Sequence, residues 1–118
     1  MTINQRLSGG VTILDVRGRM VIEVLEDRVL VERVRLLLAE GQTRILLNLE
    51  GVSYVDTMGL CNIVEAFVTT ERQGGALKLL RVPRHVRELL VVTRLLTVLE
   101  ACDSEAEAVA SFDPVMSA

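Results

Sequence analysis

The feature that most constrains the fold is an apolar run that passes directly into an amphipathic pattern. Residues 44–49 read Arg-Ile-Leu-Leu-Asn-Leu, with little alternation between polar and apolar positions. Such a run is typical of a parallel strand that is covered by protein on both faces. From about residue 57 to residue 73 the apolar residues recur at helical spacing, and Gly74–Gly75 follow. The sequence therefore predicts a buried strand that leads into a helix, with Asp56–Thr57 at the junction.

Further strands and helices alternate around this unit. In chain order, the other predicted elements are strands at residues 3–7 and 11–16, a helix at 23–40, a strand at 77–82, a helix within 84–96, a strand at 98–101 and a helix at 105–112. Gly9–Gly10 predict a tight turn between the first two strands, and Gly18 is expected to end the second. The alternation favours an α/β fold with a mixed, mostly parallel sheet of four to five strands and about four helices.

The helix after the junction is expected to bury one face. Its predicted core stripe consists of Leu60, Ile63, Val64 and Phe67. The residues expected to point toward solvent or a partner are Met58, Cys61, Asn62, Glu65 and Thr69. The first N–H groups of a helix lack partners within the helix, and an Asp or Thr side chain there can accept from them. Either Asp56 or Thr57 is therefore a candidate cap, and Gly59 is expected to allow close packing in the first turn.

Size and composition predict one domain at residues 1–113, followed by a flexible tail at 114–118. The net charge of -3 and the sequence pI of about 5.2 argue against a nucleic-acid-binding protein, which usually carries a basic excess. The N-terminus has no signal-peptide pattern, and no apolar run approaches the roughly 20 residues needed to cross a bilayer. We therefore expect a cytoplasmic protein without membrane insertion. Cys61 and Cys102 are interpreted as buried free thiols.

Enzyme signatures are missing from the sequence. The single histidine, His85, has no local motif for a catalytic triad, and neither phosphate-binding glycine pattern occurs. No cluster has metal-ligand spacing, so we predict no catalytic residue, no metal and no cofactor. A loose basic group suits either a solvated face or a docking patch for an acidic partner; it consists of Arg81, Arg84, Arg87 and Arg94.

Residues 48–60, Asn-Leu-Glu-Gly-Val-Ser-Tyr-Val-Asp-Thr-Met-Gly-Leu, resemble the signature of STAS domains. Within that family they are most similar to bacterial anti-sigma factor antagonists, whose pattern is an apolar strand, an Asp, one or two hydroxyl residues and then Gly-Leu. Gly18, residues 74–79 and residues 86–90 followed by 95–99 are also similar to the corresponding parts of that family. The resemblance covers essentially the whole chain.

The resemblance implies a STAS-like fold and a phosphorylation switch. Thr57 would be the phosphoacceptor, with Asp56 and Gly59 supporting it, and the partner surface would include Met58, Cys61, Asn62, Glu65 and Glu23. The implied partners are an anti-sigma factor that is also a Ser/Thr kinase and a Ser/Thr phosphatase, and the chain would be a monomer or weak dimer. Two alternatives stay open: a STAS subunit of a transport or stress-sensing complex with no phosphorylation cycle, or a small-molecule or nucleotide sensor.

Overall fold

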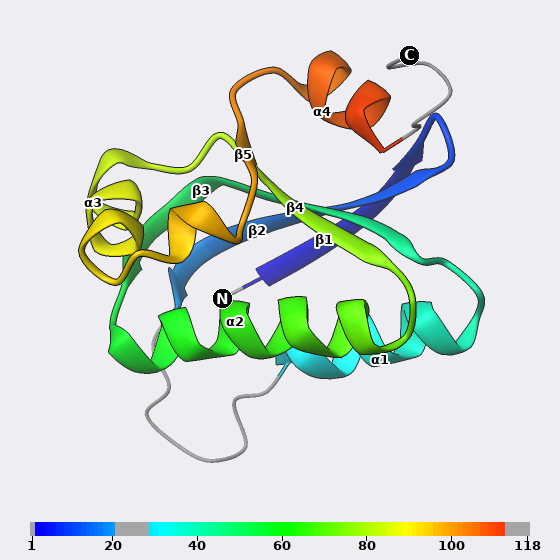
Figure 1. Cartoon of the computed structure of the whole chain (residues 1–118), viewed down its shortest axis with the longest axis horizontal. Coiled ribbons are helices and arrows are strands. Elements are labelled where there is room, and N and C mark those ends of the chain that lie inside the picture. Colours follow the sequence, from blue (N-terminus) through cyan, green and yellow to red (C-terminus); the bar gives the residue numbers. More distant parts are fainter. Residues whose placement is uncertain (1, 21–28, 113–118) are drawn as a thin grey trace.

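A five-stranded sheet forms the centre of the molecule (Figure 1). The computed structural model describes residues 2–20 and 29–112. The elements are β1 (Thr2–Ser8), β2 (Val11–Met20), α1 (Val29–Ala39), β3 (Arg44–Val55), α2 (Thr57–Arg72), β4 (Ala76–Leu80), α3 (Arg84–Val92), the short 3-10 helix η1 (Leu95–Thr97), β5 (Ala101–Cys102) and α4 (Glu105–Ser111). Their order confirms the predicted alternation of strands and helices.

The strands lie in chain order from β1 to β5. β1 pairs antiparallel with β2, and every later pairing is parallel, so the predicted mixed α/β sheet is confirmed. Gly9 and Gly10 form the tight turn between β1 and β2 with φ values of 55° and 79°. Both central residues of such a two-residue hairpin turn need positive φ, which glycine adopts without strain.

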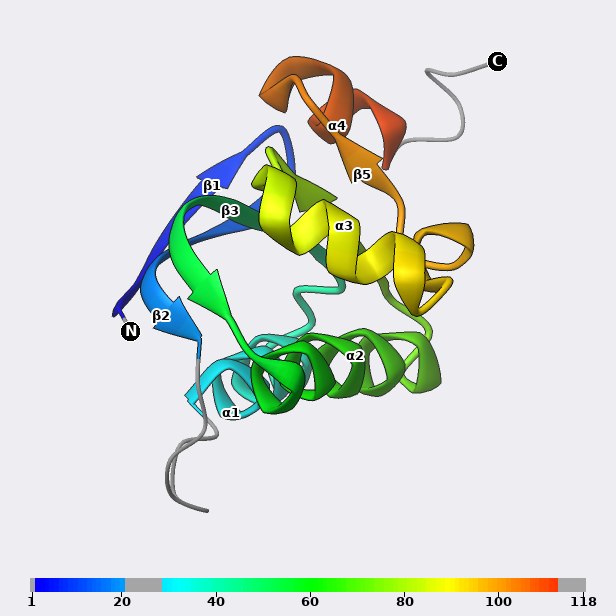
Figure 2. The ribbon, with the colours of Figure 1, turned by 90° about the vertical axis from the view of Figure 1, so that its left-hand side faces the viewer.

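Helices cover the two faces of the sheet unequally. α1, α2 and α3 pack on one face around the larger core, which includes Leu47, Leu79 and Ile63. Among the described elements, only α4 covers the other face, where Ala108 and Phe112 meet a smaller apolar cluster. Figures 1 and 2 show α1 and α2 side by side below the sheet and α4 above it. The face under α4 is therefore covered over only part of its length.

β3 is covered on both faces near its start and on one face farther along. Leu46 and Leu47 are fully buried on opposite faces, as expected for a strand covered on both sides. Farther along, Asn48 and Glu50 lie on the face that α4 leaves open, and their polar side chains suit that position. The strand continues to Val55, six residues beyond the predicted end at Leu49, because pairing with β2 continues past Gly51.

The second and the last strands also have boundaries that differ from the prediction. Gly18 does not end the second strand: β2 runs to Met20, and Gly18, with a φ of 97°, lies beside a shift in the β2–β3 register. A glycine inside a strand often marks such an irregularity, which sequence alone does not separate from a strand end. The last strand is Ala101–Cys102 rather than residues 98–101, since Leu99 contributes to the larger core and only residues 101–102 pair with β4.

The described part of the first helix begins at Val29, so the predicted start at residues 23–28, including Glu23, lies outside the described residues. The interpretation of both cysteines as buried thiols is wrong, because Cys61 is exposed and Cys102 is half-buried. Cys61 has apolar neighbours in the sequence, but adjacent residues of a helix point in different directions. Apolar neighbours in the sequence therefore do not imply that Cys61 is buried.

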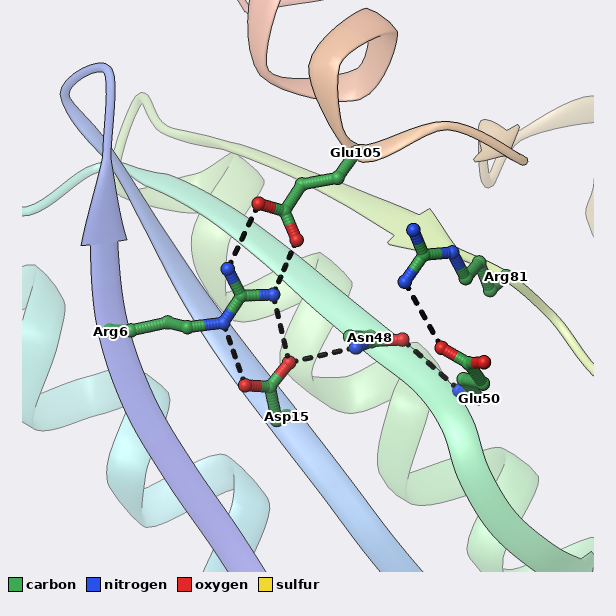
Figure 3. Close-up of polar contacts among 6 residues, drawn as sticks. All are labelled: Arg6, Asp15, Asn48, Glu50, Arg81 and Glu105. Carbon is green, nitrogen blue, oxygen red and sulfur yellow. Dashed lines mark hydrogen bonds and ion pairs between the residues drawn. The ribbon is translucent and has the colours of Figure 1, made fainter.

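An ion-pair cluster ties α4 to the sheet (Figure 3). The guanidinium of Arg6 on β1 donates to Asp15 Oδ2 on β2 at 2.7 Å and to Glu105 Oε2 at the start of α4 at 2.9 Å. The Asn48 amide donates to Asp15 Oδ1 at 2.8 Å. Hydrogen bonds from Arg6 hold the pKa of Asp15 and the pKa of Glu105 below their usual values.

Replacing Arg6 with methionine should lower the free energy of unfolding at neutral pH by about 1 kcal/mol, because two carboxylates lose their shared donor at a partly exposed site. A depressed carboxyl pKa stabilises the fold above the pKa of the unfolded chain, about 4, and that contribution is lost as pH falls through the folded-state pKa. The difference between wild type and variant should therefore shrink in acid. Urea unfolding at pH 7 and at about pH 2.5 measures it.

Arg35→Met is the matched control for this measurement. Within residues 2–20 and 29–112, Arg35 pairs only with Glu32 on the same helix, at 3.1 Å, and about half of each side chain is exposed. Such a pair contributes little, so this variant should unfold like wild type at both pH values. A loss for Arg6→Met that stays constant with pH would contradict the assigned role of the two carboxylates.

Candidate functional site

The junction between β3 and α2 is capped by Asp56. The Gly59 N–H donates to Asp56 Oδ1 at 2.7 Å, and Asp56 has extended backbone angles, as a capping residue requires. The Leu60 N–H donates to the Asp56 carbonyl at 2.9 Å and begins the helical hydrogen-bond pattern. Of the two candidate caps, the structure therefore selects Asp56 and leaves Thr57 as the first helical residue.

Gly59 brings the start of α2 against the end of β2. An added Cβ at Gly59 would lie 1.9 Å from the carbonyl oxygen of Met20, far closer than any real contact. The Asp56 N–H also donates to this oxygen, at 3.4 Å. The expectation of close packing at Gly59 is thus confirmed, and the packing partner is the backbone of a neighbouring strand.

Thr57 is exposed at this junction. Among the residues that the structure describes, none hydrogen-bonds its hydroxyl, since the capping role belongs to Asp56. Met58 beside it is also exposed, at 50 %. The N-terminus of a helix carries a partial positive charge, which favours an anion there. The Asp56 cap holds the backbone at this position, and the Thr57 side chain is exposed on it.

An apolar groove of about 480 Å³ begins at Thr57. It follows α2 and is closed on its other side by the residues after α3; its lining residues are Thr57, Leu60, Cys61, Val64, Glu65, Val68, Thr93 and Leu95. Cys61 and Glu65 therefore lie on the same surface as Thr57, as their predicted outward positions require. Thr93 and Leu95 were not predicted to line a site, because the spatial proximity of the α3–η1 region to α2 is a tertiary property.

Asn62, which was predicted to belong to the partner surface, is buried. Asn62 is only 4 % exposed and belongs to the buried stripe of α2, one turn after Gly59. The prediction that Asn62 points outward is wrong, because it relied on side-chain polarity rather than on helical position. Ala66 and Thr70 continue the same buried stripe, whereas Val64 and Phe67 are only partly buried.

Residues 2–108 match the family model described as the STAS domain. The chain belongs to the STAS domain family. The match covers every described strand and the junction that carries Asp56, Thr57 and Gly59. Comparison with curated proteins finds no match.

Solved structures share this STAS fold at low sequence identity. An anti-sigma factor antagonist from Mycobacterium paratuberculosis superposes with a TM-score of 0.78 at 14% identity, covering 94% of this chain and 92% of the other. The Bacillus cell fate determinant SpoIIAA in its phosphorylated form gives 0.70 at 17% identity, covering 95% and 100%. An anti-sigma-factor antagonist (STAS) domain protein from Planctomyces limnophilus gives 0.69 at 21% identity, covering 98% of each chain.

The remaining candidate groups are ordinary surface features of this STAS domain. His85 is exposed in the first turn of α3. Three of the four grouped arginines have acidic partners: Arg81 pairs with Glu50, Arg84 with Glu88 and Arg87 with Asp103. Such pairing favours the interpretation of a solvated face over that of a docking patch.

Two properties of the described residues concern other classes of function. Residues 2–20 and 29–112 contain no group of three His, Cys, Asp or Glu side chains placed to hold a metal ion. No helix within these ranges has both the length and the apolar character that a membrane span needs.

Proposed function

We propose that this STAS domain is an anti-sigma factor antagonist controlled by phosphorylation of Thr57. In its unphosphorylated form it binds an anti-sigma factor that is also a Ser/Thr kinase, and so releases a sigma factor for transcription. The observation that carries the proposal is the exposed Thr57 hydroxyl, held at the first residue of α2 beside an apolar groove. The structural neighbours named as anti-sigma factor antagonists, one of them in a phosphorylated form, support it.

The proposed chemistry needs only one group from this chain. The Thr57 oxygen attacks the γ-phosphorus of ATP held by the kinase, its proton passes to a base of the kinase, and ADP leaves. A Ser/Thr phosphatase later hydrolyses the phosphate ester and restores the hydroxyl. Nucleotide binding and catalysis belong to these partners, and ATP places the cycle in the cytoplasm. The chain itself acts as a binding protein rather than as an enzyme.

The physical effect of the phosphate is local. It adds about -1.5 to -2 charges at neutral pH beside the groove. The helix N-terminus tolerates this charge, so the fold itself is retained. Side chains of a partner that enter the groove would have to remove water from a dianion, and Asp56 adds further negative charge nearby. Phosphorylation therefore weakens docking without unfolding the protein.

The proposed docking surface combines exposed and groove-lining residues. Met58 and Cys61 are exposed, and Glu65 and Val68 line the groove farther along α2. Asp56 and Gly59 hold the helix start in position but face inward. A kinase approaching Thr57 would cover Met58 and the mouth of the groove at the same time. The same surface would thus serve both phosphorylation and binding.

Incubation with ATP and the anti-sigma factor kinase of the source organism, followed by intact-protein mass spectrometry, tests the proposal. Wild type should gain one phosphate, and Thr57→Ala should gain none. Ser53→Ala is the matched control, because Ser53 is an exposed hydroxyl on β3 outside the junction and its loss should leave phosphorylation unchanged. An unmodified wild type would refute the switch and leave the STAS subunit of a transport or stress-sensing complex as the better account.

A further inference from the structure

β1 is a terminal strand of the sheet. Within the described residues it pairs with β2 alone, in a continuous register from Thr2 to Ser8. Its outer side therefore presents a row of backbone N–H and C=O groups that can pair with another strand. Proteins usually protect such an edge with a proline, a bulge, a charge or a short strand. β1 has seven residues, no proline and no bulge.

The turn determines which backbone groups face outward. Ser8 and Val11 flank the two-residue turn and form its hydrogen-bonded closing pair. Hydrogen-bonded and non-hydrogen-bonded pairs alternate along an antiparallel ladder, so Arg6 and Asn4 also direct their backbone groups toward β2. Ile3, Gln5 and Leu7 consequently direct theirs to the free edge.

This pattern is self-complementary about Gln5. In an antiparallel pairing of two β1 strands across a two-fold axis at Gln5, Ile3 of each copy lies opposite Leu7 of the other, and the outward backbone groups meet. Leu7 is 71 % exposed, whereas Ile3 is partly buried against the larger core. Both side chains lie on the same face of the strand, because alternate residues do so. The pairing would therefore cover Leu7 with an apolar side chain.

Charge does not oppose the pairing. Arg6 is the only charged residue of β1, and it already donates to Asp15 and Glu105 (Figure 3). In the register centred on Gln5 it would lie opposite Asn4, a neutral residue, rather than opposite a second Arg6. Like charges directly opposite each other on two strands would be destabilising, and this register brings none together.

The opposite edge of the sheet favours a closed dimer over a fibre. β5 contains only Ala101 and Cys102, too few residues to template a strand. A head-to-tail contact between β1 of one copy and β5 of the next would propagate into a fibre. It is disfavoured because β5 offers β1 few backbone groups to pair with. Pairing of β1 with β1 uses the same surface on both copies and stops at two.

We propose that two copies of this chain associate through antiparallel pairing of β1 with β1, centred on Gln5. A single strand pair is small compared with a stable interface, so the dimer is weak and its population rises with concentration. β2 lies between β1 and the strand that leads to Thr57, which leaves that residue exposed in both copies. The dimer does not depend on the proposed phosphorylation.

Sedimentation equilibrium up to millimolar concentration tests the association. Wild type should show a reversible monomer–dimer equilibrium, and Leu7→Lys should raise the dissociation constant about tenfold or more, because the added charge would lie opposite Ile3 of the other copy. Val92→Lys is the matched control: Val92 is 80 % exposed on α3, so the same change should leave the constant unaltered. A wild type that remains monomeric throughout would overturn the proposal.

Cysteine cross-linking tests the register. In a background carrying Cys61→Ser and Cys102→Ser, Gln5→Cys should form a covalent dimer on mild oxidation, because directly opposite Cα atoms about 5.5 Å apart allow a disulfide. Thr2→Cys should not, since the two copies of residue 2 would lie roughly 20 Å apart along the strands. Equal cross-linking of the two variants would reject the register centred on Gln5, and cross-linking of neither would reject the pairing.

Discussion

Gly59→Ala should lower the free energy of unfolding by about 3 kcal/mol, the upper part of the usual range for overpacking. The added methyl would lie 1.9 Å from the Met20 carbonyl oxygen and 2.9 Å from its carbonyl carbon. Both atoms belong to backbone at the end of β2, so they cannot turn away as a flexible side chain can. Relief requires α2 to move off the sheet, which would also disturb the Asp56 cap. Urea unfolding followed by circular dichroism measures the loss.

Gly51→Ala is the matched glycine control for this prediction. An added Cβ at Gly51 would meet the Arg17 side chain at 2.7 Å and the Val16 carbonyl oxygen at 3.3 Å. The Arg17 side chain can rotate toward solvent, so we expect less than half of the loss at Gly59. Alanine also has the higher intrinsic helix propensity, which would favour Gly59→Ala in an open helix. A free energy of unfolding that is higher for Gly59→Ala than for wild type would therefore contradict the close packing of Gly59 against Met20.

Thr57→Glu should weaken binding of the anti-sigma factor kinase about a hundredfold, which corresponds to about 2.8 kcal/mol. The glutamate carboxylate would stand at the mouth of the apolar groove, where partner side chains must exclude water. Its charge is smaller than that of a phosphate, so the effect of phosphorylation itself should be at least as large. Isothermal titration calorimetry with the purified kinase measures the dissociation constant.

Two variants separate the effect of charge at Thr57 from other effects. Thr57→Ser keeps the hydroxyl and should bind and be phosphorylated like wild type. Ser53→Glu places the same charge on the exposed surface of β3 before the junction and should change affinity by much less. If Ser53→Glu weakened binding as strongly as Thr57→Glu, long-range charge rather than the groove would determine partner affinity.

The strand-to-helix junction could be predicted because local rules govern it. The apolar run at residues 44–49 can be satisfied only by burial, and the helical spacing after residue 57 requires an apolar face. Asp56 lies where a capping side chain is needed, and its bond to the Gly59 N–H follows from the chemistry of a helix start. The same chemistry applies at the start of α4, where the Ser104 hydroxyl accepts from the Glu107 N–H at 3.4 Å.

The failures of prediction occur where distant segments meet. Asn62 is polar, yet the packing of α2 buries it. Gly18 carries the usual sign of a strand end, but pairing with β3 continues past it. The groove beside Thr57 requires Thr93 at the end of α3 and Leu95 in η1, which no local pattern connects to α2.

The sequence by itself therefore determined the order of the elements, the mixed sheet and the position of Thr57 at a helix start, because hydrophobic spacing and capping act over a few residues. Only the tertiary structure decided which side chains share a surface with Thr57. It also decided which β2 carbonyl restricts Gly59 and which strand is left at the edge of the sheet. These properties depend on how far each helix and strand covers its neighbours. That coverage arises from contacts between residues far apart in the chain.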